Sequence, residues 1–247
     1  MLEKMKKTVA FCTLGCKVNQ YETNAMIEQF MRKSYEIKEF NEKADIYIIN
    51  TCTVTNIADR KSRQMLRRVK EINPSAIVVA CGCYAQVARE ELEKIEDIDL
   101  IYGTNEKNKI AEYIEQWIAE NESYSSIEKK DIEQNNNSEN LKKSNEKFLD
   151  AKNTNSNLKN AKRSNSSKSK VTDVMYQKEF LDFGTTDYTE KTRAVIKVQD
   201  GCDRFCTYCI IPYARGHVRS RKIESVIAEI KEIAKKHIIG EKGDANG

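Results

Sequence analysis

The chain has 247 residues, eight cysteines, and 42 basic against 38 acidic residues, which gives a formal net charge of +4. This length allows one or two domains with hydrophobic cores, and the mildly basic balance permits a nucleic-acid partner without requiring one. No apolar run approaches a membrane span and no signal-peptide core follows the first residues, so we expect a cytoplasmic protein. In that reducing compartment, cysteines are metal ligands more often than disulfide partners.

Residues 1–120 alternate between strand and helix patterns, which is typical of a parallel sheet covered by helices. Apolar runs predict strands over 8–14, 44–49, 76–80 and 99–102, and a further short strand over 35–40. Apolar residues spaced one turn apart predict helices between the strands, including one that contains Ala88, Leu92 and Ile95. The fold class is therefore α/β, with an open parallel sheet in the amino-terminal domain.

Three cysteines, Cys16, Cys52 and Cys83, each follow the carboxyl end of a predicted strand. Ligands of open parallel α/β sheets bind in the crevice outside these ends. Thiols that lie dozens of residues apart in the sequence are therefore expected to meet at one edge of the sheet. Because a cubane iron–sulfur cluster takes four ligands, three thiolates would leave one of its positions open.

The helix expected after Cys52 is strongly basic. Arg60, Arg63 and Arg67 lie at positions i, i+3 and i+7, so they share one face. Two interpretations of this face stay open: contact with RNA phosphates, which gives salt-dependent affinity, or an ordinary solvated helix surface.

Residues 121 to about 170 are rich in Asn, Ser and Lys and poor in large apolar side chains. Such a composition buries too little surface to offset the entropy of ordering, so it predicts a disordered polar insert. We place the domain boundaries at 1–120 for the α/β domain, 121–178 for the insert and linker, and 179–247 for a second domain.

A second cysteine group, Cys202, Cys206 and Cys209, has the spacing C-x3-C-x2-C and follows a strand-like run over 194–198. One loop with this spacing can place three thiolates around one face of a cubane cluster, again leaving one iron open. An open coordination position is what a catalytic metal site needs. The alternative is a structural zinc site, for which His217 is the only nearby fourth ligand.

This cysteine loop resembles the cluster loop of the radical S-adenosylmethionine enzymes, and its flanks over Val198–Gly216 resemble their methylthiotransferase branch. The segments Thr13–Thr23, Ile49–Thr55 and Ala80–Gln86 resemble the three cysteine motifs of the amino-terminal domain in that family. Matched residue by residue, Cys16, Cys52 and Cys83 are the ligands of one cluster. Cys12 and Cys81 have no counterpart as ligands, so we interpret both as packing residues.

The resemblance implies a flavodoxin-like amino-terminal domain, the disordered insert, and then the start of a radical S-adenosylmethionine partial (β/α) barrel. It implies two [4Fe-4S] clusters, one on Cys16, Cys52 and Cys83, and one on the loop of Cys202, Cys206 and Cys209 that also binds S-adenosylmethionine. The implied partners are tRNA, S-adenosylmethionine and a reductant protein, with no membrane. The residues of the first motif, Thr13–Thr23, resemble those of one subgroup in particular. This subgroup adds a methylthio group to C2 of N6-threonylcarbamoyladenosine 37 in tRNA.

The resemblance ends before the rest of the barrel, so the chain looks like a truncated, frameshifted or split form, which we expect not to methylthiolate tRNA by itself. Two other readings stay open. One is a catalytically inactive iron–sulfur-binding fragment, which would retain every cysteine ligand. The other is a methylthiotransferase that acts on another tRNA adenosine or on a ribosomal protein. The arginines Arg215, Arg219 and Arg221 are interpreted as contacts to RNA or cofactor, or as solvated residues.

We predict that residues 121 to about 170 are cleaved by a nonspecific protease before either flank, because their low apolar content leaves the backbone unprotected. Limited proteolysis followed by mass spectrometry of the fragments tests this. Slow cleavage spread evenly along the chain would show instead that the insert is packed.

Overall fold

The computed structural model describes residues 7–121, 168–184 and 194–243, with side chains described as far as residue 235. Residues 1–111 and 168–247 form one compact unit and 112–167 form another. The insert expected at 121–178 therefore lies largely outside the described residues. Among the residues that are described, no helix has the length and apolar character needed to cross a bilayer.

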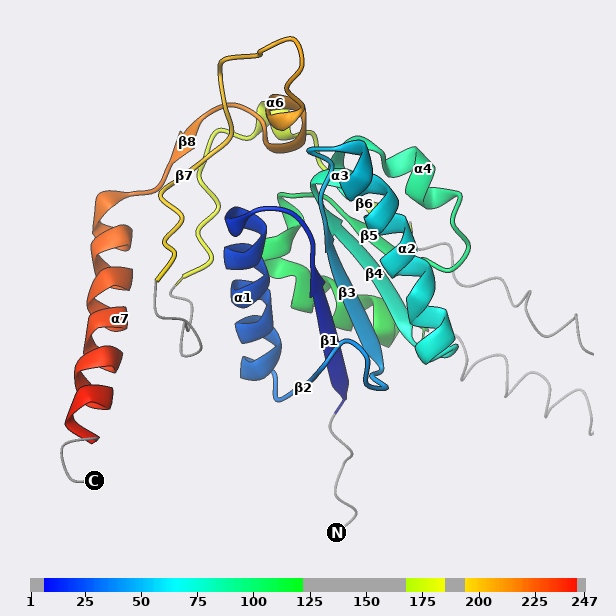
Figure 1. Ribbon diagram of the computed structural model, residues 1–247, viewed down its shortest axis with the longest axis horizontal. Helices are drawn as coiled ribbons and strands as arrows, with labels where there is room; N and C mark the ends of the chain where they lie inside the picture. Colours follow the sequence, from blue (N-terminus) through cyan, green and yellow to red (C-terminus); the bar gives the residue numbers. More distant parts are fainter. Residues whose placement is uncertain (1–6, 122–167, 185–193, 244–247) are drawn as a thin grey trace, which may run out of the picture. The chain divides into compact units, whose positions relative to one another are not determined.

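A parallel sheet of six strands forms the centre of the first unit (Figure 1). Its strands are β1 (Thr8–Thr13), β2 (Glu36–Lys38), β3 (Ile46–Thr51), β4 (Ile77–Gly82), β5 (Leu100–Tyr102) and β6 (Ser169–Lys170). They lie in the order β2-β1-β3-β4-β5-β6 and every neighbouring pair is parallel. The first five strands follow the flavodoxin-like order, so the expected fold class is confirmed.

The order of the strands creates a switch point between β1 and β3. From β1 the chain crosses to β2 on one side, whereas the later strands β3, β4 and β5 are added on the other side. The connections after β1 and β3 therefore diverge, and open parallel α/β sheets bind their ligands outside the carboxyl ends of strands at such a point. Cys16 and Cys52 lie on these two connections.

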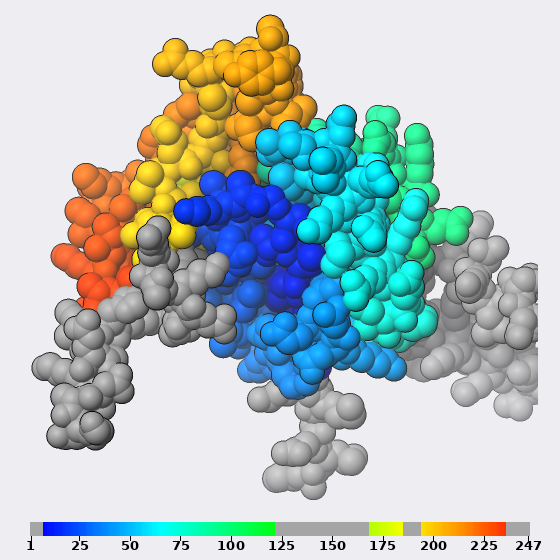
Figure 2. Space-filling view, in the orientation of Figure 1, coloured from blue at the N-terminus to red at the C-terminus, as the bar shows by residue number. Residues whose placement is uncertain are grey.

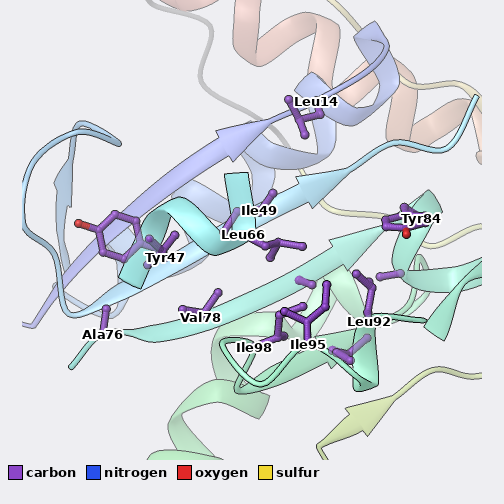
Figure 3. Packing of buried hydrophobic residues seen from close by; sticks show 14 of the residues in the cluster. Leu14, Tyr47, Ile49, Leu66, Ala76, Val78, Tyr84, Leu92, Ile95 and Ile98 are labelled. Carbon is purple, nitrogen blue, oxygen red and sulfur yellow. The ribbon is translucent and has the colours of Figure 1, made fainter. Parts of the chain in front are cut away.

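Helices lie between the strands: α1 (Lys17–Arg32), α2 (Asn56–Ile72), α3 (Cys83–Val87), α4 (Arg89–Glu93), the 3-10 turn η1 (Glu106–Lys109) and a helix over 110–121. Strand β3 is buried along its whole length, as expected for a central parallel strand covered on both faces. On one face, Tyr47 and Ile49 pack with Leu66 of α2 and Leu92 of α4 in the main hydrophobic cluster (Figure 3).

The structure differs from the expected elements at three places. The helix predicted around Ala88 and Leu92 is divided into α3 and α4, because the backbone of Ala88 lies outside the helical region at φ −122° and ψ 38°. Strand β6 lies inside the range expected to be linker, where it pairs with the edge of β5. A two-residue strand of Ser and Lys has no apolar alternation, so the sequence pattern did not indicate it.

The third difference concerns the strand expected over 194–198, which is extended chain without ladder pairing. The regular part is β7 (Gln199–Asp200), which pairs antiparallel with β8 (Arg219–Ser220). The elements of this carboxyl-terminal segment are the 3-10 turn η2 (Val174–Tyr176), β7, α6 (Ile211–Arg215), β8 and α7 (Ile223–Gly243). Strand propensity alone forms no ladder, because each strand needs a hydrogen-bonding neighbour.

Buried charges join this carboxyl-terminal segment to the sheet domain. Glu22 of α1 is 1% exposed and accepts hydrogen bonds from Lys107 Nζ at 2.6 Å and Lys197 Nζ at 2.7 Å. It also accepts two bonds from the guanidinium of Arg215, at 2.8 and 3.2 Å. Burial alone would raise the pKa of Glu22, but Arg215, Lys107 and Lys197 outweigh it and hold that pKa well below its ordinary value.

A second buried ion pair connects α7 to α1. Arg221 pairs with Glu229, which accepts a hydrogen bond from the hydroxyl of Tyr21, and Arg221 also pairs with Asp182 at 2.8 Å. Several apolar side chains of α7 are exposed: Ile223 at 67%, Ile227 at 43% and Ile230 at 47%. The described contact between α7 and α1 is therefore made by the carboxylate of Glu229.

We predict that Glu22→Gln lowers the free energy of unfolding by about 3–5 kcal/mol at neutral pH, because it leaves buried cations without their anion. Since the folded-state pKa of Glu22 is depressed, its contribution is full above the unfolded pKa of about 4.3 and is lost as the pH falls through the folded value. The difference between the two proteins should therefore shrink in acid. Urea unfolding at pH 7 and in acid measures both effects.

The matched control is Glu36→Gln, which breaks an exposed pair with Lys38 whose side chains are 50% and 29% exposed. An exposed pair contributes less than about 1 kcal/mol. Equal effects of the two substitutions would contradict a central role for Glu22.

Candidate metal centre

The three separated cysteines lie at the carboxyl edge of three neighbouring strands. Cys16 is the N-cap residue of α1, Cys52 directly follows β3, and Cys83 begins α3 directly after β4. Burial raises the pKa of the Cys52 thiol; a hydrogen bond from the backbone of Val54 opposes this, and the charges of Cys83 and Cys16 add to the rise. The three cysteines thus stand at one edge of the sheet, each at the end of one of three neighbouring strands.

Two glycines allow the close approach of these turns. Gly15 has φ +101°, and a Cβ atom there would lie 2.6 Å from Cys52 Sγ. Gly82 has φ +98°, and a Cβ atom there would lie 2.5 Å from the carbonyl oxygen of Thr51. Because both positions combine left-handed backbone with contact below van der Waals distance, only glycine is tolerated without displacing the neighbouring turn.

Asn19 ties the turns that precede Cys16 and Cys52. Its buried Nδ2 donates to the carbonyl of Leu14 at 2.8 Å and to that of Thr51 at 3.0 Å. The hydroxyl of Thr51 in turn donates to the carbonyl of Cys81 at 2.5 Å and accepts from the backbone of Ala85 at 3.2 Å. A short chain of buried hydrogen bonds thus fixes all three cysteine turns against one another.

Cys12 and Cys81 take the packing roles expected for them. Cys81 is fully buried in β4, and Cys12 packs partly against the main hydrophobic cluster from β1. Burial raises the pKa of Cys81 to about 12. A thiol with this pKa stays protonated at neutral pH and is a poor metal ligand.

The second cysteine group lies on the loop between β7 and α6, which Figure 1 shows at the end of the sheet where β1, β3 and β4 finish. Cys206 is exposed, and Cys202 and Cys209 are partly exposed. The loop is closed at its base by the backbone of Cys202, which donates to the carbonyl of Gly216 at 3.0 Å. In Figure 2 the gold-coloured part of the chain around this loop projects at the surface.

His217, the fourth ligand of the zinc alternative, has its Nδ1 2.6 Å from Asp203 Oδ1. Within the described parts of the chain, no group of three or more His, Cys, Asp or Glu side chains is arranged to hold a metal ion. A cubane cluster has a less demanding requirement than a single ion, since each of its irons takes its own thiolate. The donor set and the glycine cradle at Cys52 fit such a cluster.

Arg215 connects the two cysteine groups. Besides Glu22, its guanidinium donates to Asn19 Oδ1 at 2.8 Å and to Asp200 Oδ1 at 3.0 Å. Asn19 fixes the turns of Cys16 and Cys52, whereas Asp200 lies two residues before Cys202. One buried side chain therefore spans both groups.

The structure corrects one expectation about the arginines of this region. Arg215, Arg219 and Arg221 are 4%, 5% and 7% exposed, so they are not solvated residues. Each of them is engaged with polar groups of this chain. The sequence alone did not show their carboxylate partners, which are Glu22 and Asp200 for Arg215, Asp200 for Arg219, and Asp182 and Glu229 for Arg221.

The basic residues of α2 fall into two groups: some bond to other parts of the chain and some are exposed. Arg63 donates to the hydroxyl of Tyr84 at 2.5 Å, with its guanidinium 5.6 Å from the ring centroid, and Lys70 donates to the carbonyl of Ala76. Arg60 and Arg67 are exposed. Contact with RNA phosphates and an ordinary solvated surface therefore both stay open for the exposed Arg60 and Arg67.

The roles of Asn19 and Glu22 were missed in the sequence, although both lie in the quoted motif Thr13–Thr23. Their spacing at i and i+3 places them on one face of α1. The sequence did offer one signal: these two polar residues share a helix face whose apolar neighbours predict burial.

Comparison with known proteins identifies relatives over most of the chain. The model of the Uncharacterized protein family UPF0004 matches residues 8–103. The chain is 37% identical to the threonylcarbamoyladenosine tRNA methylthiotransferase of Aquifex aeolicus, over 92% of this chain and 45% of that protein. The corresponding enzyme of Bacillus subtilis is 36% identical, with 92% of this chain and 40% of that protein covered.

The ribosomal protein uS12 methylthiotransferase of Desulfitobacterium hafniense is also similar, at 31% identity over 94% of this chain and 43% of that protein. The chain thus spans less than half the length of these relatives. The family model covers Cys16, Cys52 and Cys83. Over more than 90% of its own length, this chain is thus similar to methylthiotransferases.

Proposed function

We propose that this chain is the cluster-binding part of a tRNA methylthiotransferase that modifies C2 of N6-threonylcarbamoyladenosine 37. The observation that supports this proposal is that Cys16, Cys52 and Cys83 stand at the carboxyl ends of three neighbouring strands, in turns joined by the hydrogen bonds of Asn19 and Thr51. The proposed substrate is the one for which the relatives with 37% and 36% identity are named.

In this proposal Cys16, Cys52 and Cys83 hold one [4Fe-4S] cluster, and Cys202, Cys206 and Cys209 hold another that also binds S-adenosylmethionine. When bound, the clusters supply the electron for reductive cleavage of S-adenosylmethionine and the site of the sulfur that is transferred. No further protein thiolate is needed, because the fourth position of each cluster is left for substrate or sulfur.

The residues of this chain orient and shield these groups. Asn19 and Thr51 hold the turns of the first triad, and Gly15 leaves room for the thiol of Cys52. In the first triad Cys52 and Cys83 are each 3% exposed and Cys16 is exposed, whereas in the second triad Cys206 is exposed and Cys202 and Cys209 are partly exposed. The more exposed loop is where a soluble cofactor and a reductant protein have access.

The exposed arginines of α2, Arg60 and Arg67, are proposed as phosphate contacts for tRNA. They lie on the helix that follows Cys52, near the candidate centre. Such contacts position a nucleic acid without reading its sequence, so they support RNA as a substrate class and do not select the adenosine.

We predict about eight irons per chain after anaerobic reconstitution, from two four-iron clusters, and about half of that after replacement of Cys202, Cys206 and Cys209 by Ala. Gly15→Ala should likewise remove one cluster, because the added Cβ displaces the Cys52 thiol. The control is Gly184→Ala, which has a similar φ of +78° but no atom within 4 Å of the new Cβ. Iron analysis and electron paramagnetic resonance measure the outcome; stoichiometric zinc with little iron would contradict the proposal.

We further predict that disruption of the gene for this chain removes the methylthio group from threonylcarbamoyladenosine in the tRNA of its host. Mass spectrometry of digested tRNA measures this, and a gene copy with Cys202, Cys206 and Cys209 replaced by Ala should fail to restore the modification. Unchanged tRNA would support the inactive-fragment reading. Loss of a methylthio group from another adenosine or from a ribosomal protein would replace the proposed substrate.

A further inference from the structure

The buried charges between the two cysteine groups are unequal in number. The anions are Glu22 and Asp200; the cations, each at most 5% exposed, are Lys107, Lys197, Arg215 and Arg219. All of them are linked by contacts of 4 Å or less, in one group that we call the charge cluster. Its described members therefore carry more positive than negative charge.

The excess is not balanced inside the group. Arg219 donates to the carbonyl of Arg215 at 2.5 Å and lies 3.8 Å from Asp200, but its buried Nε has no partner among the described residues. A buried cationic excess is costly unless an anion accompanies it. The charge cluster is therefore built to lie beside negative charge that the side chains within it do not supply.

The thiolates of Cys16, Cys52 and Cys83 are the candidate source of that negative charge. Arg215 is the member of the charge cluster that is connected to this triad: it donates to Asn19, whose amide nitrogen bonds the turns before Cys16 and Cys52. Thiolates in metal sites are anionic, and the Arg215 guanidinium is a permanent cation. Its other bonds, to Glu22 and Asp200, fix the guanidinium between α1 and the base of the second cysteine loop.

We propose that Arg215 is a positioning residue for both cysteine groups and that its charge favours the reduced form of a cluster held by Cys16, Cys52 and Cys83. This inference rests on the proposed function, since it requires that the triad binds a cluster. Reduction adds one negative charge to a group that is already anionic through its thiolates. A fixed cation nearby in a medium of low dielectric stabilises that added charge, and such electrostatic surroundings set the potentials of iron–sulfur centres.

The experiment isolates the first triad in a background in which Cys202, Cys206 and Cys209 are replaced by Ala. In that background Arg215→Gln removes the charge, while Lys107 and Lys197 still pair with Glu22. Arg215→Lys keeps the charge but loses the fork that reaches Asn19 and Asp200. Arg221→Lys is the control, because Arg221 forms a similarly buried pair with Glu229 and touches α1 only at the hydroxyl of Tyr21, with no bond to Asn19 or Asp200.

We expect Arg215→Gln to make reduction about tenfold less favourable, which is a shift of about 59 mV to more negative potential for a one-electron couple. Arg215→Lys should stay near the unsubstituted potential, and so should Arg221→Lys. In the chain without metal, both Arg215 variants should speed hydrogen exchange in residues 13–20 and 199–217, whereas Arg221→Lys should leave 199–210 unchanged. Redox titration followed by electron paramagnetic resonance, and hydrogen-exchange mass spectrometry, measure these effects.

The outcomes separate this inference from the proposed function. If the unsubstituted background takes up no iron, the proposed function fails at the first triad. If iron is bound but Arg215→Gln leaves the potential unchanged, the charge role is overturned. Should Arg215→Gln fail to fold, Arg215→Lys decides the positioning role, which unchanged exchange in both segments would overturn.

Discussion

The structure depends on the carboxylate of Glu22, which is completely enclosed and meets three cationic side chains from distant parts of the chain. Lys107 follows the last strand of the first domain, while Lys197 and Arg215 flank the second cysteine loop. A buried ion group of this kind is weak evidence for high stability, since desolvation offsets much of its attraction. Its value is geometric: an unpaired buried charge is so unfavourable that the segments have one acceptable arrangement.

That arrangement brings two kinds of cysteine site together by different means. The first triad is assembled by topology, because three neighbouring parallel strands end at the same edge and their turns carry one thiol each. The second is assembled locally, within a single loop whose ends are closed by β7 and β8. The shared partners of Arg215 couple the topological site to the local one.

The polar residues around the first triad explain why its motifs extend beyond the cysteines. The side-chain amide of Asn19 forms hydrogen bonds with Leu14, Thr51 and Arg215. Gly15 and Gly82 occupy positions where a side chain would collide with the neighbouring turn. Ligand orientation at metal sites depends on such neighbours as much as on the ligands themselves. The turns are thus held in place by hydrogen bonds within the chain itself.

The sequence by itself determined the α/β class, the positions of the strands along residues 8–102, and the two cysteine groups. These features are visible because apolar periodicity and ligand spacing are local properties. It also identified Cys12 and Cys81 as packing residues. It did not find β6, the break at Ala88 or the burial of Arg215, Arg219 and Arg221. Two of these depend on partners far away in the chain: the edge of β5 for the backbone of β6, and Glu22 for the guanidinium of Arg215. Only tertiary structure decided them, because the stability of a strand edge or a buried charge is a property of the pair that forms.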